Sequence, residues 1–493
     1  MRRLLTAVGV GMLWALASAG QGFQPQIPRV WDDASMAELE LPLASGLRPE
    51  HVPSRYYYAI PERPVWKSYP VYAPAREPAG YFERLKTLEP ERAFDAKALR
   101  TREDWIRAGR QVFESANTFP PVSFPFTEVH NPAWWRATGA LAAKDGTLPY
   151  YRYVIREKGR VELTFDSCAS CHSRVLPDGE VIWGGPGSIA FGRQWAHLIR
   201  SEPVEKRAQP AWPELTIFFA APWIQPDPQA GLRQWTMEDM ARQLDSIPRG
   251  VLPRQGTSIL YPSKIPDLIG IKDRRYLDNT GLQQHRSIAD LMRYAAINNF
   301  IEEITLYGKF RPVGELPPAG TLLRSSDEDL YALALFLYSL EAPRSPYPRN
   351  GEAARGEKVF EREGCGTCHP APLYTNNKLT PAKGFRPPAD HRKKYDVMDV
   401  VVGTDSSLAM TTRRGTGYYR VPSLKGVWYR GPFEHNGSVA TLEDWFDERR
   451  LSPDYVPTGY KGPRGRRAVL GHEYGLRLKA DEKRALIAFL RTL

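Results

Sequence analysis

The four cysteines of this 493-residue chain fall into two identical patterns, and no cysteine is left over. The two patterns are Cys168-Ala169-Ser170-Cys171-His172 and Cys365-Gly366-Thr367-Cys368-His369. A Cys-x-x-Cys-His motif is the attachment signature of c-type haem. Two thiols bond to the two haem vinyl groups, and the following histidine lies beneath the iron as its proximal ligand. The sequence therefore predicts two covalently bound haems, with His172 and His369 as iron ligands.

A zinc site, a redox-active dithiol and a pair of disulfides are the alternatives to haem for these cysteines. Two Cys-x-x-Cys pairs can form a zinc site with four thiolates, but zinc does not require a histidine after each pair, and the pairs lie far apart in the chain. A thioredoxin-type redox motif would not occur twice with the same trailing histidine. A disulfide within each pair would be strained. Covalent haem accounts for every residue of both motifs.

The N-terminus predicts export. Arg2 and Arg3 precede an apolar stretch, residues 4–16, which is followed by the small residues Ala17-Ser18-Ala19. This order is typical of a secretory signal peptide, and the apolar stretch is short for a membrane span. An uncleaved anchor is the alternative. We expect residues 1–19 to be removed, leaving no stable membrane span, and the mature chain to be periplasmic or secreted, where c-type haem is attached.

The composition is that of a folded chain. With 42% hydrophobic residues, 25% charged residues and a mean hydropathy of −0.45, it excludes a disordered chain and a multi-span membrane protein. The net charge of +11 suits an acidic partner or nucleic acid. Because an exported protein rarely meets nucleic acid, we expect no nucleic-acid partner.

Segments around the first motif are repeated around the second. Residues 108–113 resemble 355–360, within amphipathic helices that precede each motif, and residues 265–271 resemble 421–427. Each half closes with acidic residues followed by an apolar helix, at 327–340 and at 481–493. Acids in the first turn suit the helix dipole, and apolar residues at helical spacing give a buried face. A helix before the haem motif and a crossing helix at the end of the module form the plan of cytochrome c.

We therefore expect a mainly α fold with two tandem cytochrome c-like domains, each around one covalent haem, together with a Pro-rich N-terminal arm and loop insertions. The expected boundaries are 20–100 for the arm, 101–342 for the N-terminal haem domain and 350–493 for the C-terminal haem domain. Residues 175–182 predict a tight hairpin. We expect the aromatic residues before Cys168 to wall a haem pocket or fill a core, with a substrate platform as the alternative: Phe119, Phe124, Phe126, Trp134, Trp135, Tyr150, Tyr151 and Tyr153.

The chemistry of each haem depends on the sixth iron ligand, because a filled position passes electrons and an open one binds peroxide or oxygen. For the second haem we predict His472, in a loop just before the terminal helix. Met410 and His435 are its rivals. Aligning the closing helices places Pro317-Pro318-Ala319-Gly320 opposite His472, and none of these side chains binds iron. The first haem either is open or takes a ligand from elsewhere: His130, His197, His285, Tyr307 or Lys309.

Residues 101–493 resemble the di-haem cytochrome c peroxidase family, including its MauG-type members and the rubber-cleaving oxygenases. The resemblance is most specific in residues 415–427, and it continues through 435–438 to 441–443. It implies that the C-terminal haem receives or stores electrons, and that peroxide or oxygen reacts at the N-terminal haem, which makes His172 the expected catalytic residue. His472 departs from the peroxidases, which supply a methionine there, and is similar to the oxygenases.

The family also implies a calcium ion between the domains and a tryptophan between the haems, for which Trp183, Trp195 and Trp223 are candidates. The expected function is that of an exported oxidoreductase acting on peroxide or dioxygen. Its electron donor is expected to be a small redox protein or a quinol-linked cytochrome. The alternative is a non-catalytic electron-transfer cytochrome in which both irons have six ligands.

Overall fold

The computed structural model describes residues 23–116, 126–164, 166–211, 217, 219–254, 256–300 and 303–493, without the side chains of residues 126, 127 and 300. The expected signal peptide and two of the aromatic residues, Phe119 and Phe124, lie outside this part. Helices take 35% of the chain and strands 13%, so the expected excess of helix over strand is confirmed. Within the described residues, no helix combines the length and the apolar character that a bilayer span requires.

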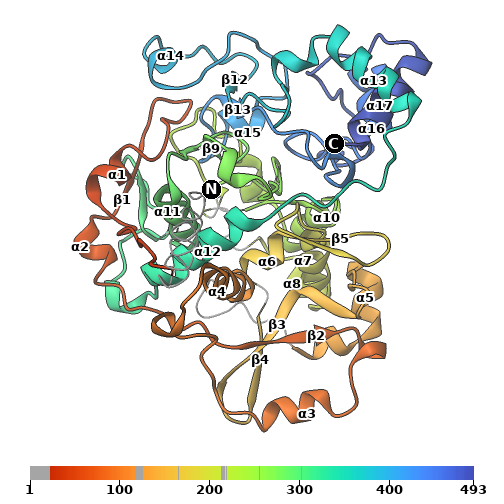
Figure 1. Ribbon diagram of the computed structural model, residues 1–493. Helices are drawn as coiled ribbons and strands as arrows, with labels where there is room; N and C mark the ends of the chain where they lie inside the picture. Colours follow the sequence, from red (N-terminus) through yellow and green to blue (C-terminus); the bar gives the residue numbers. More distant parts are fainter. Residues whose placement is uncertain are drawn as a thin grey trace, which may run out of the picture.

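Figure 1 shows the arrangement of the elements, coloured along the chain. The α-helices are α1 (Asp33–Ala37), α2 (Ser54–Tyr57), α3 (Tyr81–Lys86), α4 (Arg102–Glu114), α5 (Pro132–Thr138), α6 (Cys168–Cys171), α7 (Phe191–Arg200), α8 (Val204–Arg207), α10 (Met237–Asp245), α11 (Ile288–Phe300), α12 (Asp327–Ser339), α13 (Gly351–Arg362), α14 (His391–Lys394), α15 (Ser407–Met410), α16 (Leu442–Trp445) and α17 (Ala480–Arg491). The strands are β1 (Pro49–His51), β2 (Ser68–Tyr72), β3 (Thr147–Glu157), β4 (Arg160–Thr164), β5 (Ser173–Val175), β6 (Val181–Trp183), β7 (Val251–Leu252), β8 (Ser263–Lys264), β9 (Tyr276–Leu277), β10 (Gln283–Gln284), β11 (Thr305–Tyr307), β12 (Leu379–Pro381) and β13 (Tyr418–Arg420).

Two helix pairs repeat the same close crossing. Helix α4 packs on α12, and α13 packs on α17. A Cβ atom on Gly109 of α4 would overlap the carbonyl of Ala332, and a Cβ atom on Gly356 of α13 would overlap the carbonyl of Ala485. Glycine is therefore required in both pairs, because only its missing side chain lets the two backbones touch. These are the helices that the sequence repeat predicted to cross.

An aromatic contact accompanies each crossing. The rings of Phe113 and Phe336 lie 5.2 Å apart in the first pair, and those of Phe360 and Phe489 lie 5.4 Å apart in the second. Ring pairs at this separation stabilise beyond the area they bury. The four phenylalanines occupy equivalent positions in the two sequence repeats, so the repeat extends to the side-chain packing.

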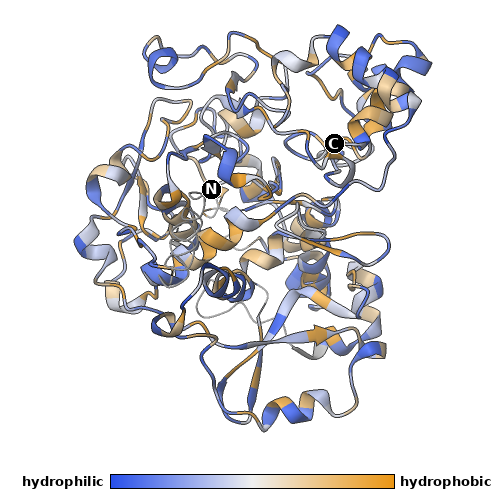
Figure 2. Ribbon diagram, in the orientation of Figure 1, coloured by the Kyte–Doolittle hydropathy of each residue, from blue (hydrophilic) through white to orange (hydrophobic). Residues whose placement is uncertain are grey.

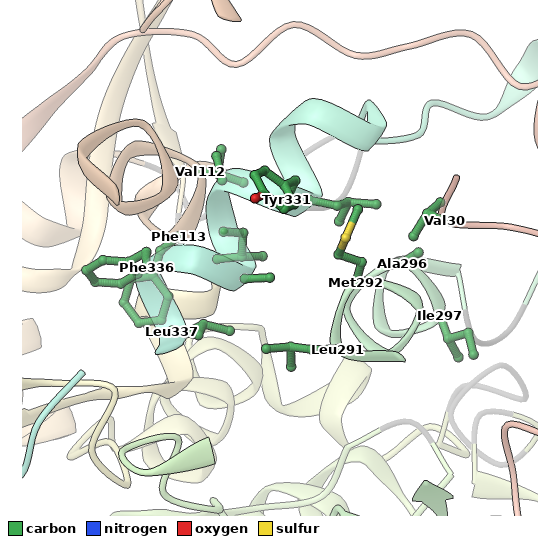
Figure 3. Packing of buried hydrophobic residues seen from close by; sticks show 14 of the residues in the cluster. Val30, Val112, Phe113, Leu291, Met292, Ala296, Ile297, Tyr331, Phe336 and Leu337 are labelled. Carbon is green, nitrogen blue, oxygen red and sulfur yellow. The ribbon is translucent and has the colours of Figure 1, made fainter. Parts of the chain in front are cut away.

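The main hydrophobic core surrounds the first helix pair. Figure 3 shows residues of α4, α11 and α12, with Val30 from the N-terminal segment, directed toward a shared interior. Helix α12 is buried on nearly every side, and Figure 2 shows it as a hydrophobic element at the centre of the molecule. A helix that is apolar all round needs neighbours on all faces. The α4, α11 and N-terminal segments supply them.

The N-terminal segment, residues 23–100, packs mainly on the N-terminal half of the molecule and also contacts the C-terminal half. Strand β1 pairs with β11, and β2 pairs with β3. The Nε of Arg293 in α11 donates to the carbonyl of Val30 over 2.8 Å. Leu41 packs in a small cluster with Leu379 and Tyr418, which belong to the C-terminal half.

A three-stranded antiparallel sheet, in the order β2-β3-β4, is the largest element that the sequence reasoning did not predict. Strand β3 is buried over most of its length, so it lacks the alternation of polar and apolar residues that identifies a strand exposed on one face. Tyr150, Tyr151 and Tyr153 of this strand are buried with Trp134 in one hydrophobic core. For these aromatic residues the prediction that they fill a core is therefore confirmed. The hairpin expected at residues 175–182 is confirmed as β5 and β6.

Candidate functional site

The two Cys-x-x-Cys-His motifs form similar tight turns. The first is helix α6, whose N-terminus is capped by Ser167, and the second is a single 3-10 turn, Cys365–Thr367. In both turns the histidine N–H donates to the carbonyl of the first cysteine, His172 to Cys168 and His369 to Cys365, each over 2.9 Å. The turn therefore fixes the position of the histidine relative to the two thiols.

All four cysteines are half-buried, and none forms a disulfide. The described part of the chain also contains no cluster of three or more His, Cys, Asp or Glu side chains suited to a metal ion. The structure thus brings no zinc site together from the two cysteine pairs. The expected calcium ion likewise has no carboxylate cluster among the described residues and stays a prediction from the family resemblance.

Both motif histidines are neutral imidazoles. Burial, helped by the charge of Arg254, lowers the pKa of His172 to about 3, and burial lowers the pKa of His369 to about 4. A neutral imidazole is the form that binds a metal. Backbone carbonyls lie against both rings, from Pro266 at His172 and from Pro422 at His369. These prolines are equivalent residues of the sequence repeat.

The loops that carry these prolines are structurally equivalent. Gly270 and Gly426 both adopt the left-handed conformation, with φ of 72° and 71°, and each precedes a 3-10 turn, Ile271–Asp273 or Val427–Tyr429. Arg274 donates to the carbonyl of Asp267, and Arg430 donates to the carbonyl of Ser423. The repeated segment thus builds the same support behind each motif histidine.

His472 faces His369. The centres of the two imidazole rings lie 6.4 Å apart, with their planes inclined by 54°. An imidazole nitrogen bound to a metal at about 2.0–2.1 Å places its ring centre about 3.2 Å from that metal, so two opposed ligands have centres about 6.4 Å apart. The Nδ1 of His369 lies 3.1 Å from the carbonyl of Tyr374. This contact fixes the tautomer and leaves Nε2 for the metal. The distance therefore fits two histidines that would hold one iron between them.

The loop around His472 is held in an uncommon conformation. His472 itself has φ of 47°, which a non-glycine residue rarely adopts. Its N–H donates to the carbonyl of Val402 over 2.6 Å. The fully buried Arg450 donates to the carbonyls of Gly471 and His472 over 2.8 Å and 2.9 Å. Strained residues persist where the surroundings over-determine them, often at functional sites.

The rivals of His472 are occupied elsewhere. The ring of His435 stacks on Tyr419, 4.8 Å away, and lies within 4 Å of the carboxylates of Asp405 and Glu434. Met410 packs at the edge of a cluster that contains Leu408 and Tyr419. Among the described residues, the ring that faces His369 is His472.

His172 has no corresponding partner among the described residues. His130 contacts Tyr153 at 2.7 Å, and His197 lies 3.4 Å from Glu128. His285 uses both ring nitrogens, Nδ1 with the Arg274 carbonyl at 2.8 Å and Nε2 with the Tyr338 hydroxyl at 2.7 Å. The remaining candidates are Tyr307, which stacks on Trp223, and Lys309, which is exposed. No contact of the structure brings any of these five side chains to His172.

The tryptophan candidates lie in three different environments. Trp183 is in β6, beside the strand that follows His172, and Arg110 lies over its ring at 4.8 Å. Trp195 packs in a cluster around α7 and α10, whereas Trp223 stacks on Tyr307. Trp428 was not identified from the sequence, and it packs with Ile182 and Ile269 of the N-terminal half. Its position between the two halves follows only from the tertiary structure.

A buried ion pair also joins the two supporting loops. The Asp267 carboxylate pairs with Arg430, and both side chains are less than a tenth exposed. The Tyr429 hydroxyl donates to the same carboxylate over 3.1 Å. Sequence reasoning missed this contact, because nothing in the repeat shows that one loop faces the other.

Comparisons with known proteins give limited likenesses. No family model matches the chain. An uncharacterized protein of Sinorhizobium fredii, named y4iJ, is 33% identical over 15% of this chain and 18% of its own length. The chain therefore matches less than a fifth of that relative.

Several solved structures are similar at low TM-scores. A hydrazine synthase of Kuenenia stuttgartiensis has 15% identity and a TM-score of 0.30, covering 60% of this chain and 92% of its own. The diheme peroxidase BthA of Burkholderia thailandensis has 18% identity and a TM-score of 0.27, covering 50% and 75%. A MauG-like protein associated with microbial copper homeostasis has 21% identity and a TM-score of 0.23, covering 34% and 57%. At these scores the function has to be argued from the chain's own residues.

Proposed function

We propose that this chain is an exported di-haem c-type cytochrome that acts as an oxidoreductase on peroxide or dioxygen. The N-terminal site, with His172, is the reaction site, and the C-terminal site, with His369 and His472, transfers electrons. One observation carries the proposal: among the described residues, two equivalent motifs and supporting loops present one histidine that faces a second histidine and one that does not.

Haem, when bound, supplies an iron that exchanges single electrons and reacts with oxygen species where a ligand position is open. The protein residues decide which position is open. Neutral His172 and His369 are each held on one face by a motif turn and a supporting loop. At the second site His472 would hold the iron together with His369, and Arg450 and the Val402 carbonyl fix its loop.

The two sites differ in their suitability for bond-breaking chemistry. At the second site, His369 and His472 face each other and would both hold the iron, which suits electron storage and transfer. At the first site, no histidine among the described residues faces His172, so an iron held there would keep a ligand position for a small oxidant. The donor that we propose, a small redox protein or a quinol-linked cytochrome, would deliver electrons to the second site.

Spectroscopy of the purified holoprotein tests this division. Electron paramagnetic resonance should show one high-spin ferric haem that changes on adding peroxide and one low-spin haem that does not. Two low-spin haems that ignore peroxide in both the oxidised and half-reduced states would instead identify an electron carrier.

Paired cysteine variants assign the signals to the sites. Replacing Cys168 and Cys171 with alanine should remove the peroxide-sensitive signal, whereas replacing Cys365 and Cys368 should remove the low-spin signal. The second variant is the matched control for the first, because each deletes one haem and leaves the other. The reverse assignment would contradict the proposal.

A further inference from the structure

A cavity of about 350 Å³ lies between the two halves of the chain, away from the facing histidines. Its walls come from the segment before β3, from the β5–β6 hairpin, and from Gly431 and Pro432 of the C-terminal half. The volume is at the lower end of the range for small-molecule pockets. The apolar part of the lining consists of Leu141, Ala142, Val175, Leu176, Pro177 and Pro432.

Two arginines, Arg174 and Arg249, supply the charge of this cavity, and its lining contains no acidic residue. Neither arginine forms an ion pair among the described residues, although the Asp267 carboxylate acts on Arg174 from a longer distance. The Nε of each is buried and has no hydrogen-bond partner in the described part of the chain. An unpaired buried donor on a charged group costs free energy, so such groups normally have a partner.

The remaining contacts of the arginines fix their positions. Arg174 donates from Nη1 to the carbonyl of Gly431 over 2.8 Å, which joins the two halves of the chain. Arg249 donates from Nη2 to the carbonyl of Gly139. Both guanidinium groups are thus anchored through one nitrogen to the backbone, and each keeps a buried Nε–H unpaired. Anchored guanidinium groups lose little freedom when they bind an anion.

We propose that this cavity binds an organic carboxylate. A guanidinium group matches the two oxygens of a carboxylate, and two such groups that form no direct ion pair favour a negative charge between them. The apolar walls favour a ligand with a short hydrocarbon chain over a bare inorganic anion. The carboxylate comes either from a free organic acid or from a propionate of a covalent haem. Only the second source rests on the proposed function.

Calorimetric titration of the holoprotein tests the free-acid source. Hexanoate should bind saturably, and uncharged hexanamide should not, at matched ionic strength. Arg174→Gln and Arg249→Gln should each weaken hexanoate binding by about tenfold or more, because each removes a charge-assisted contact. The matched control is Arg242→Gln, since Arg242 is an exposed arginine that pairs with Asp239 on α10. Ala142→Phe, which fills the cavity without changing charge, should also weaken binding.

Resonance Raman spectra and redox titration of the same variants test the propionate source. If hexanoate does not bind the parent protein, Arg174→Gln and Arg249→Gln should shift the haem propionate bands and a midpoint potential, and Arg242→Gln should shift neither. Hexanoate binding that both arginine variants leave unchanged overturns the proposal. Absence of both hexanoate binding and propionate shifts also overturns it. Hexanoate binding would support the carboxylate site even if spectroscopy shows that the protein is an electron carrier.

Discussion

Single residues decide how each proposed haem site would be completed, and His472 is the clearest case. The sequence places it just before the terminal helix, but a loop histidine can point anywhere. The structure turns it toward His369 by a positive φ and by the carbonyl contacts of Arg450. The role of Arg450 could not be identified from the sequence, because no sequence pattern distinguishes a buried arginine from the many exposed ones. A buried arginine bonded to carbonyls is visible only in the folded chain.

His472→Ala should convert the second haem from low-spin to high-spin. The variant removes the side chain that faces His369 and leaves the motif turn intact. Optical and paramagnetic resonance spectra measure the change, and added imidazole should restore the low-spin signal by replacing the lost ligand. The control is His391→Ala, since His391 is a buried histidine that contacts Tyr418. A low-spin second haem in His472→Ala would show that another residue is the ligand.

Asp278→Asn should make stability less dependent on acid pH. Asp278 forms a buried ion pair with Arg414. Burial raises the pKa of Asp278, but the charges of Arg414 and Arg254 and several hydrogen bonds leave it below the unfolded value of 3.8. A carboxylate with a lowered folded-state pKa stabilises the fold above the unfolded pKa, and this stabilisation is lost as the pH falls through the folded-state pKa.

Urea denaturation across the acid range measures this effect. At neutral pH, Asp278→Asn should lose about 3–5 kcal/mol, because it leaves Arg414 buried without its charge partner. As the pH falls below the pKa of Asp278 in the unfolded chain, the unfolding free energy of the parent protein should decrease and approach that of the variant. A difference in unfolding free energy between the parent protein and the variant that stays constant down to about pH 2 would contradict the lowered pKa of Asp278.

At the scale of elements, local signals identified the helices best. The helices 102–114, 327–339, 351–362 and 480–491 have amphipathic or apolar patterns, and acids occupy the first turn of each. These signals act within one helix and are therefore readable in a sequence. Strand β3 was missed because its burial on both faces removes the alternating pattern.

Gly109→Ala and Gly356→Ala should each separate a helix pair. A Cβ atom at either position overlaps a backbone carbonyl of the facing helix, which cannot move without moving the whole helix. We expect each variant to lose at least about 2 kcal/mol of unfolding free energy. Chemical denaturation followed by circular dichroism measures the loss.

Gly351→Ala is the matched control for the second pair. It lies in the same helix as Gly356 and has open space around it. Removing a glycine from such a site stabilises by up to about 1 kcal/mol. A loss in Gly351→Ala as large as that in Gly356→Ala would show that the helix crossing is not the cause.

At the scale of the whole molecule, the two halves are joined by polar contacts between repeat-related loops. Asp267 pairs with Arg430 and accepts from Tyr429, and Arg174 donates to the Gly431 carbonyl. Such contacts hold the loops behind His172 and His369 in a fixed relation. The two residues of each contact lie far apart in the sequence, so no local sequence pattern predicts the contact.

Asp267→Asn should uncouple the two halves. It removes a buried charge and leaves Arg430 unpaired, which costs about 3–5 kcal/mol. We expect tryptophan fluorescence and haem absorbance to report separate unfolding transitions in the variant and a coincident transition in the parent protein. Asp245→Asn is the control, because Asp245 forms a half-exposed pair with Arg200 within one half and should have little effect. Coincident transitions in Asp267→Asn would contradict this role.

The sequence by itself determined the internal repeat and the two motifs on which the proposed haem attachment depends. Each motif, 168–172 and 365–369, spans only five residues, and the repeated segments 265–271 and 421–427 are also short. Covalent and backbone geometry act over the same short range, so these features can be read from the sequence. Tertiary structure decided that His472 faces His369, that Asp267 meets Arg430, and that Arg174 and Arg249 share a cavity. These contacts join residues far apart in the chain, and they form only when packing of the whole molecule brings the segments together.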